Sequence, residues 1–153
     1  INEKDSYGNT ALHNAATNGH SRCVAHLINA GADVSATEVY GATPLAWASA
    51  NGHSSVVTML ITAGADVNAA NKYKETALHE AASHGHAAVV KLLLEAGANP
   101  NVLDIHKQTP LQKAEAAGHT ETARMLRKVM QLPATTPTAP AATPAAPSAP
   151  AAS

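Results

Sequence analysis

The sequence has no phenylalanine and few other aromatic residues, with one tryptophan and three tyrosines among 153 residues. Aromatic residues make up only 3% of the chain, although 45% of it is hydrophobic. A single large core normally obtains much of its buried area from aromatic side chains. The dominance of small and aliphatic residues instead favours thin helices that stack closely.

Cysteine and net charge are also scarce, and each shortage excludes a class of protein. Cys23 is the single cysteine, which excludes an intramolecular disulfide and a thiolate zinc site and favours an intracellular location, in the cytoplasm or nucleus. The net charge of -1 provides no overall field that would attract nucleic acid. No apolar run approaches the roughly 20 residues that span a bilayer. We therefore expect neither a nucleic-acid nor a membrane partner.

A unit of 33 residues recurs along the chain without insertion or deletion. Its most regular columns are a threonine, a leucine two positions later, and a Gly-His pair. They comprise Thr10, Thr43, Thr76 and Thr109; Leu12, Leu45, Leu78 and Leu111; and Gly19-His20, Gly52-His53, Gly85-His86 and Gly118-His119. Periods of this length are typical of solenoids, in which each unit packs against its neighbours.

Each unit predicts two short helices and a protruding loop. The threonine is a helix N-cap, and Pro44 and Pro110 suit the first helical position that follows it. The glycine of the Gly-His pair ends this helix in a left-handed conformation. A second helix follows with apolar residues at helical spacing, such as Val57 and Leu60, and Gly64 ends it. An extended hairpin tip then leads into the next unit.

These motifs resemble the ankyrin repeat, as in Thr43-Pro44-Leu45, Thr10-Ala11-Leu12-His13 and Gly64-Ala65-Asp66-Val67-Asn68. The resemblance implies an all-α ankyrin-repeat solenoid of stacked helix-turn-helix units with protruding β-hairpin loops. We assign repeats to residues 5–37, 38–70 and 71–103, a C-terminal capping repeat to 104–131, and the remnant of a preceding repeat to 1–4.

Four positions depart from the repeated pattern. Lys74 and Lys107 replace the hairpin glycine seen at Gly8 and Gly41. Ala46 and Gln112 replace the histidine found at the start of the other first helices, His13 and His79. We expect weaker hydrogen bonds at the starts of these two helices.

The two ends of the repeat array have their own features. Arg127 occupies a column that is otherwise Ile or Leu, where a charge suits a terminal cap that meets water. Residues 1–4 align with the tail of a repeat, so we expect the natural array to continue upstream. Residues 132–153 hold six of the nine prolines and are expected to be a disordered Pro/Ala/Thr-rich linker. Their PxxP spacings could alternatively dock in an aromatic groove.

The reactive side chains recur at the repeat spacing and do not form a cluster. The histidines are therefore expected to bond loops of adjacent repeats and not to bind a metal. Cys23 shares its column with Val56 and Val89 and is expected to be a small buried hydrophobe. No glycine-rich phosphate loop is present. The sequence predicts no enzyme activity, no cofactor and no metal site.

The candidate partner-binding residues lie in columns expected to face one concave surface. All three tyrosines fall in one hairpin column, where they could be hot spots, could pack on neighbouring hairpins, or could do both. The only tryptophan lies in an otherwise polar first-helix column, which favours partner contact over packing. The candidates are Tyr7, Tyr40, Tyr73, His106, Trp47, Asn14, Glu80, Lys113, Asn18, Asn51, His84, Lys72 and Glu75.

We interpret the chain as a monomeric protein–protein interaction module that binds a protein or peptide on this concave face. A mild patch of Lys72, Lys74, Lys107 and Lys113 favours a ligand of modest acidic character. The alternatives are a targeting or autoinhibitory arm of a larger enzyme whose catalytic domain lies outside this segment, and a purely structural spacer. Alanine substitutions on the face would separate binding from packing.

The resemblance further implies a modification. Ankyrin repeats are often substrates of an asparaginyl hydroxylase that acts on a turn asparagine with a leucine eight residues earlier. Asn68 with Leu60 matches this pattern, and Asn101 with Leu93 matches it more weakly because Pro100 intervenes. The same asparagine would otherwise bond its own backbone in the turn.

Overall fold

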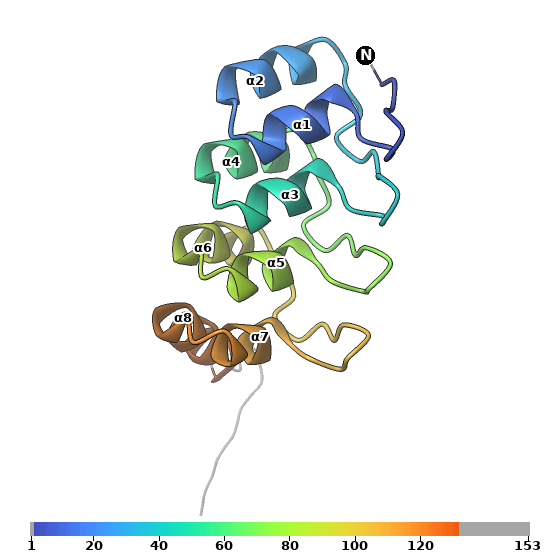
Figure 1. The fold of residues 1–153 in the computed structure, drawn as a ribbon. Coiled ribbons are helices and arrows are strands. Elements are labelled where there is room, and N and C mark those ends of the chain that lie inside the picture. The colour runs from blue at the N-terminus through green and yellow to red at the C-terminus, as the bar shows by residue number, and fades with distance from the viewer. Residues whose placement is uncertain (1, 132–153) are drawn as a thin grey trace, which may run out of the picture.

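The computed structural model describes residues 2–131, so the predicted linker at 132–153 lies outside the described residues. Within the described range the chain forms eight helices and no β-strand, stacked in two rows with loops projecting from one side (Figure 1). The row next to the loops holds α1 (Ala11–Thr17), α3 (Pro44–Ala50), α5 (Ala77–Ser83) and α7 (Pro110–Ala116). The outer row holds α2 (Ser21–Asn29), α4 (Ser54–Thr62), α6 (Ala87–Glu95) and α8 (Thr120–Gln131). The predicted all-α solenoid is confirmed.

Threonine N-caps start the inner helices, as the sequence predicts. The Thr10 hydroxyl accepts a hydrogen bond from the backbone N–H of His13, and Nδ1 of His13 in return accepts from the N–H of Thr10 at 3.1 Å. The side chain of Gln112 replaces this second bond at 2.9 Å from the N–H of Thr109, so the expected weakening there is wrong. At Ala46 the expectation is correct, because only the threonine half of the arrangement remains.

The core runs as a continuous column between the two helix rows. Leu12, Leu45 and Leu78 from the inner helices are buried, as are Leu60 and Leu93 from the outer helices. Full burial of one such side chain contributes about 1.5–3 kcal/mol. The small alanines that fill the remaining positions let the thin helices approach closely, which explains how the chain folds with so few aromatic residues.

Histidines connect each repeat to its neighbour. Because Nδ1 of His13 accepts a hydrogen bond within its own repeat, Nε2 carries the proton and donates to the carbonyl of Ala42 in the next loop at 3.0 Å. His79 repeats this bond to Gln108 at 3.0 Å. His53 and His86 of the Gly-His pairs reach back to carbonyls of the preceding inner helices, each at 3.0 Å. The predicted bonds to loops of adjacent repeats are confirmed for His13 and His79, whereas His53 and His86 bond the last residues of inner helices.

Each loop folds back as a tight turn held by one polar side chain. The carboxylate of Asp5 accepts the backbone N–H groups of Tyr7 and Asn9 at 2.8 and 2.9 Å. Glu38, Asn71 and Asp104 make the equivalent pair of bonds in the following loops. Backbone bonds between successive tips, such as the N–H of Val39 to the carbonyl of Tyr7 at 2.8 Å, tie the loops into a row.

The first repeat corrects one prediction. Cys23 is exposed, whereas Val56 and Val89 of the same column are fully buried. This column faces the preceding repeat, and in the described structure nothing is stacked on that side of α2. At the other end Arg127 is exposed and forms an ion pair with Glu115, consistent with a cap that meets water.

Candidate functional site

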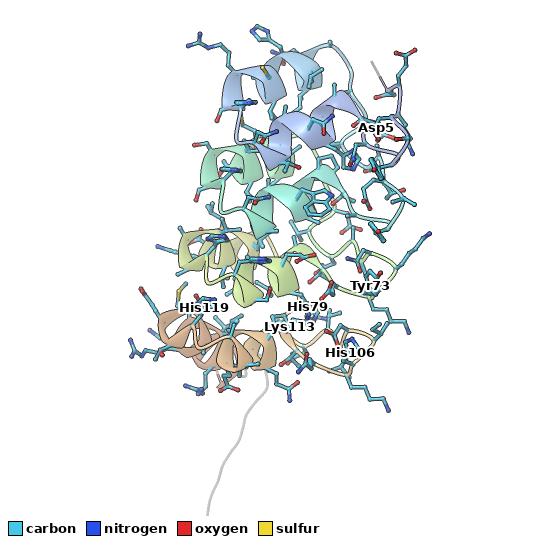
Figure 2. The ribbon with its side chains drawn as sticks, in the orientation of Figure 1. Asp5, Tyr73, His79, His106, Lys113 and His119 are labelled. Atoms are coloured by element: carbon cyan, nitrogen blue, oxygen red, sulfur yellow. The ribbon has the colours of Figure 1, made fainter. Side chains whose placement is uncertain are left out.

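Most of the predicted partner-binding residues lie where the row of loop tips adjoins the inner helices; we call this surface the concave face. Figure 2 shows Tyr73 and His106 on the loops and Lys113 beside them, whereas His119 lies on the opposite side of the stack near α8. The tight turns direct the side chains of the tyrosine column away from the helices. Threonine caps set the rotation of each inner helix, so residues four positions after the cap face the loops.

The tyrosine column is largely accessible. Tyr7 is 66% exposed, Tyr40 51% and Tyr73 45%, and His106 at the next position is also exposed. The rings of Tyr40 and Tyr73 stack with centroids 6.3 Å apart and an interplanar angle of 28°. These two rings therefore pack on each other and still present about half of their surface to solvent.

The inner-helix column changes character from repeat to repeat. Asn14 is exposed, whereas Trp47, Glu80 and Lys113 are half-buried against the loops. The indole Nε1 of Trp47 is buried and has no hydrogen-bond acceptor within residues 2–130. Buried polar groups are nearly always paired, so an unpaired donor on a candidate binding face is notable.

A cavity of about 230 Å³ opens on this face between the second and third loops. Its lining comprises Tyr40, Ala42, Trp47, Asn71, Tyr73, Glu75 and Glu80. Burial, together with the nearby negative charge of Glu75, raises the pKa of Glu80 above its usual value. The cavity thus combines aromatic faces with two carboxylates, one of them held in an unfavourable environment.

Lys113 is held by carboxylates of its own chain. Its ammonium forms an ion pair with Glu75 and lies 3.3 Å from the carboxylate of buried Asp104. Burial lowers the pKa of Lys113, but the two carboxylates outweigh it and raise the pKa above normal. Burial raises the pKa of Asp104. Hydrogen bonds from the backbone N–H groups of Gln108 and His106, together with Lys113, outweigh burial, so the pKa of Asp104 is lower than normal.

Other candidate residues lie at the ends of the inner helices. The side-chain amides of Asn18 and Asn51 donate to carbonyls one turn back, at 2.8 and 2.9 Å. His84 is exposed, and its ring stacks on that of His86 with centroids 6.1 Å apart. In the described part of the chain no three histidine, cysteine or acidic side chains come together in a way that could hold a metal ion. Lys72 is exposed on the third loop, and its backbone N–H donates to the carbonyl of Tyr40.

The two asparagines of the predicted modification differ in their surroundings. Asn68 is exposed, yet its side-chain oxygen accepts the backbone N–H of Asn99 at 2.8 Å and its amide donates to Gly97 at 3.4 Å. Asn101 is exposed in the following turn. Hydroxylation of either residue stays a prediction.

Sequence reasoning missed the residues that shape the loops. Asp5, Glu38, Asn71 and Asp104 decide where the tyrosines point, because their side chains fix the tight turns. An acidic or amide side chain two positions before the tyrosine column was the available signal, since such side chains favour bonds to nearby backbone N–H groups.

The fold and this face define a class of protein: a rigid helical repeat scaffold that presents a long surface of aromatic and polar side chains. The chain belongs to the ankyrin repeat family. Family models described as ankyrin repeats (3 copies) and ankyrin repeats (many copies) match residues 1–71 and 60–114. A search of the curated proteins found no match.

Membership of this family carries a general expectation about activity. Ankyrin repeats are generally protein–protein interaction modules, and domains built from them are typically scaffolds without catalytic activity. The helices described for this chain include none that is both long and apolar enough to traverse a bilayer.

Proposed function

We propose that the concave face binds a protein or peptide ligand through its tyrosine column and the adjoining inner-helix column. The observation that carries this proposal is the exposure of Tyr7, Tyr40 and Tyr73 in one row. Tyrosine is favoured at binding hot spots because it offers a large rigid surface with a polar tip. Three aliphatic residues of the loops, Val39, Leu103 and Ile105, are also about half exposed and would extend the contact.

The inner-helix column supports the same proposal. Trp47 and Glu80 line the cavity between the second and third loops. Concave sites that combine apolar walls with a few polar groups are the usual form of a recognition pocket. The ligand would lie along the row of loops and insert one or more side chains toward the inner helices.

Three alanine substitutions test the proposal: Tyr40→Ala, Tyr73→Ala and Trp47→Ala. Peptides that bind the chain are first selected from a random library and then titrated against each variant, with thermal unfolding recorded in parallel. A binding role predicts that affinity falls while the melting temperature changes little. If the melting temperature falls and affinity is unchanged, the column is structural and the proposal is wrong.

A further inference from the structure

The cavity between the second and third loops shows which ligand chemistry this face would accept. We call it the loop 2–3 pocket and define it by Tyr40, Trp47, Tyr73, Glu75 and Glu80. Three of these residues are aromatic and two are acidic. Among the described residues, no basic side chain lines the pocket.

Glu80 differs from the other acidic residue of the pocket, Glu75, in having no ion-pair partner among the described residues. Glu75 is paired with Lys113. Burial and the repulsion from Glu75 make the charged form of Glu80 unfavourable. A positive group placed beside Glu80 would offset both effects by Coulomb attraction, adding to the weaker opposing effects of His84 and Lys113.

The aromatic residues favour the same kind of ligand. The face of an aromatic ring attracts a cation, most strongly for tryptophan, and the attraction grows as the cation is desolvated. Tyr40 and Tyr73 stack on each other and line the pocket from the loops, and Trp47 lines it from the inner helix α3. A cationic side chain entering here would contact aromatic surface along its stem and carboxylate oxygens at its tip.

The chain itself contains an example of this recognition one repeat further along. Lys113 occupies the column of Trp47 and Glu80, and its ammonium lies between the carboxylates of Glu75 and Asp104. A cation on this face is thus bound by acidic groups from the loops. The pairing also removes Lys113 from the basic patch that the sequence suggested, which weakens the expectation of an acidic ligand.

We infer that the loop 2–3 pocket accepts a lysine or arginine side chain from a basic peptide segment of the partner. This inference rests on the proposed function, because it specifies the chemistry of a ligand on the same face. The exposed aliphatic residues of the neighbouring loops would contact the rest of the segment.

The test uses the full chain and its single tryptophan. The indole N–H resonance of Trp47 reports on the pocket directly, because no other residue contributes to that region of the NMR spectrum. The first probes are short acetylated Gly/Ser peptides with one central arginine or lysine, and their neutral counterparts with citrulline or acetyl-lysine. We expect the cationic peptides to shift the Trp47 resonance and the neutral peptides to leave it unchanged.

A matched pair of variants then identifies the carboxylate. Glu80→Gln should weaken binding of the cationic peptides by about tenfold, because it removes the carboxylate partner of the cation and leaves the aromatic contacts in place. Glu95→Gln removes an exposed charge of the same type at the end of α6 and should leave binding unchanged. Unchanged binding in Glu80→Gln would overturn the inference.

Peptide selection on the full chain separates failure of this inference from failure of the proposed function. Selected peptides that shift resonances of Tyr40, Trp47 and Tyr73 and are rich in lysine or arginine support both. Peptides that bind the face equally well after their basic residues are replaced by citrulline or acetyl-lysine uphold the proposed function and refute the cation pocket. Selection that returns no peptide for this face refutes both.

Discussion

A Cβ atom added to Gly52 would lie 2.7 Å from Nδ1 of His86, which belongs to the following repeat. Gly52 also has a φ of +75°, a conformation that side chains with a Cβ atom disfavour. Two separate requirements therefore select glycine here, one local and one from the stacking of repeats. Gly19 and Gly85 meet His53 and His119 in the same way.

We predict that Gly52→Ala destabilises the stack by at least about 2 kcal/mol. A left-handed conformation costs an alanine about 1–2 kcal/mol, and the new methyl group must also displace the ring of His86. That displacement breaks the 3.0 Å bond from His86 to the carbonyl of Ala50. Urea denaturation followed by circular dichroism measures the loss.

Gly118→Ala is the matched control for this prediction. Gly118 has a φ of +80°, but no atom of the part of the chain that the structure describes lies within 4 Å of its hypothetical Cβ atom. Its substitution should cost only the conformational part, about 1 kcal/mol after the reduced entropy of the unfolded chain is counted. Equal losses in the two variants would show that contact with the histidine is unimportant.

The buried histidines make stability depend on pH. Burial lowers the pKa of both His13 and His79 below the usual 6.5, so the folded chain favours the neutral ring. The unfolded chain therefore binds more protons below that value. The stability from these residues is present above pH 6.5 and is lost as the pH falls through the folded pKa. Protonation would also remove the Nδ1 acceptor used by Thr10 and Thr76.

We predict that His79→Gln flattens this pH dependence. Gln112 already accepts the threonine N–H at the equivalent position, so glutamine should keep the local bond. The variant would lose the bond to Gln108, at about 0.5–1.5 kcal/mol at pH 7.5. Urea denaturation at pH 7.5 and pH 5 should show the gap between the two proteins narrowing at the lower pH. Parallel losses in both proteins would contradict this account.

The sequence was most informative where structure is decided locally. Threonine caps, glycine stops and the apolar columns act within one repeat, and they locate the helices and residues such as Leu60 correctly. Side-chain contacts between repeats were harder to predict from the sequence. The pairing of Lys113 with Glu75 joins residues 38 positions apart, and it depends on side-chain reach that spacing alone does not encode.

The sequence was also a poor guide to which residues of one column are buried. Equivalent columns predict equivalent surroundings only where a neighbouring repeat is stacked on both sides. Cys23 and Val56 share a column but differ in exposure because the first described repeat has a neighbour on one side only. The same reasoning correctly assigned Arg127 to an exposed end.

Two lysines retain a conformation that glycine adopts in the earlier loops. Lys74 has a φ of 60° and Lys107 of 61°, whereas Gly8 and Gly41 hold the equivalent positions. We predict that Lys74→Gly stabilises the chain by about 0.5–1 kcal/mol. Relief of the left-handed strain, about 1–2 kcal/mol, exceeds the added entropy of the unfolded chain, about 0.4–1 kcal/mol.

Lys74→Ala controls for the lost charge and the shortened side chain. Alanine keeps the unfavourable backbone conformation, so this variant should gain no stability. Thermal unfolding of the three proteins in one buffer makes the comparison. A gain in the alanine variant as large as that in the glycine variant would assign the effect to the charge.

The exposure of Cys23 gives a direct chemical test of the end of the stack. Its side chain borders a hollow of about 430 Å³ that also includes Ala11, Ala15 and Leu27. We predict that the folded chain reacts rapidly with an aromatic disulfide reagent, with absorbance as the readout. The control is Val56→Cys in a Cys23→Ser background, because position 56 lies in the same column but is fully buried.

The control thiol should react only as the protein unfolds, and its rate should rise with urea. Cys23 should show no such dependence, since opening of the structure is not needed to reach it. If Cys23 were instead protected in the absence of urea, another surface would have to cover the apolar end of α2. Protection that disappears on dilution would identify that surface as a second copy of the chain, whereas protection independent of concentration would contradict the described packing of the first repeat.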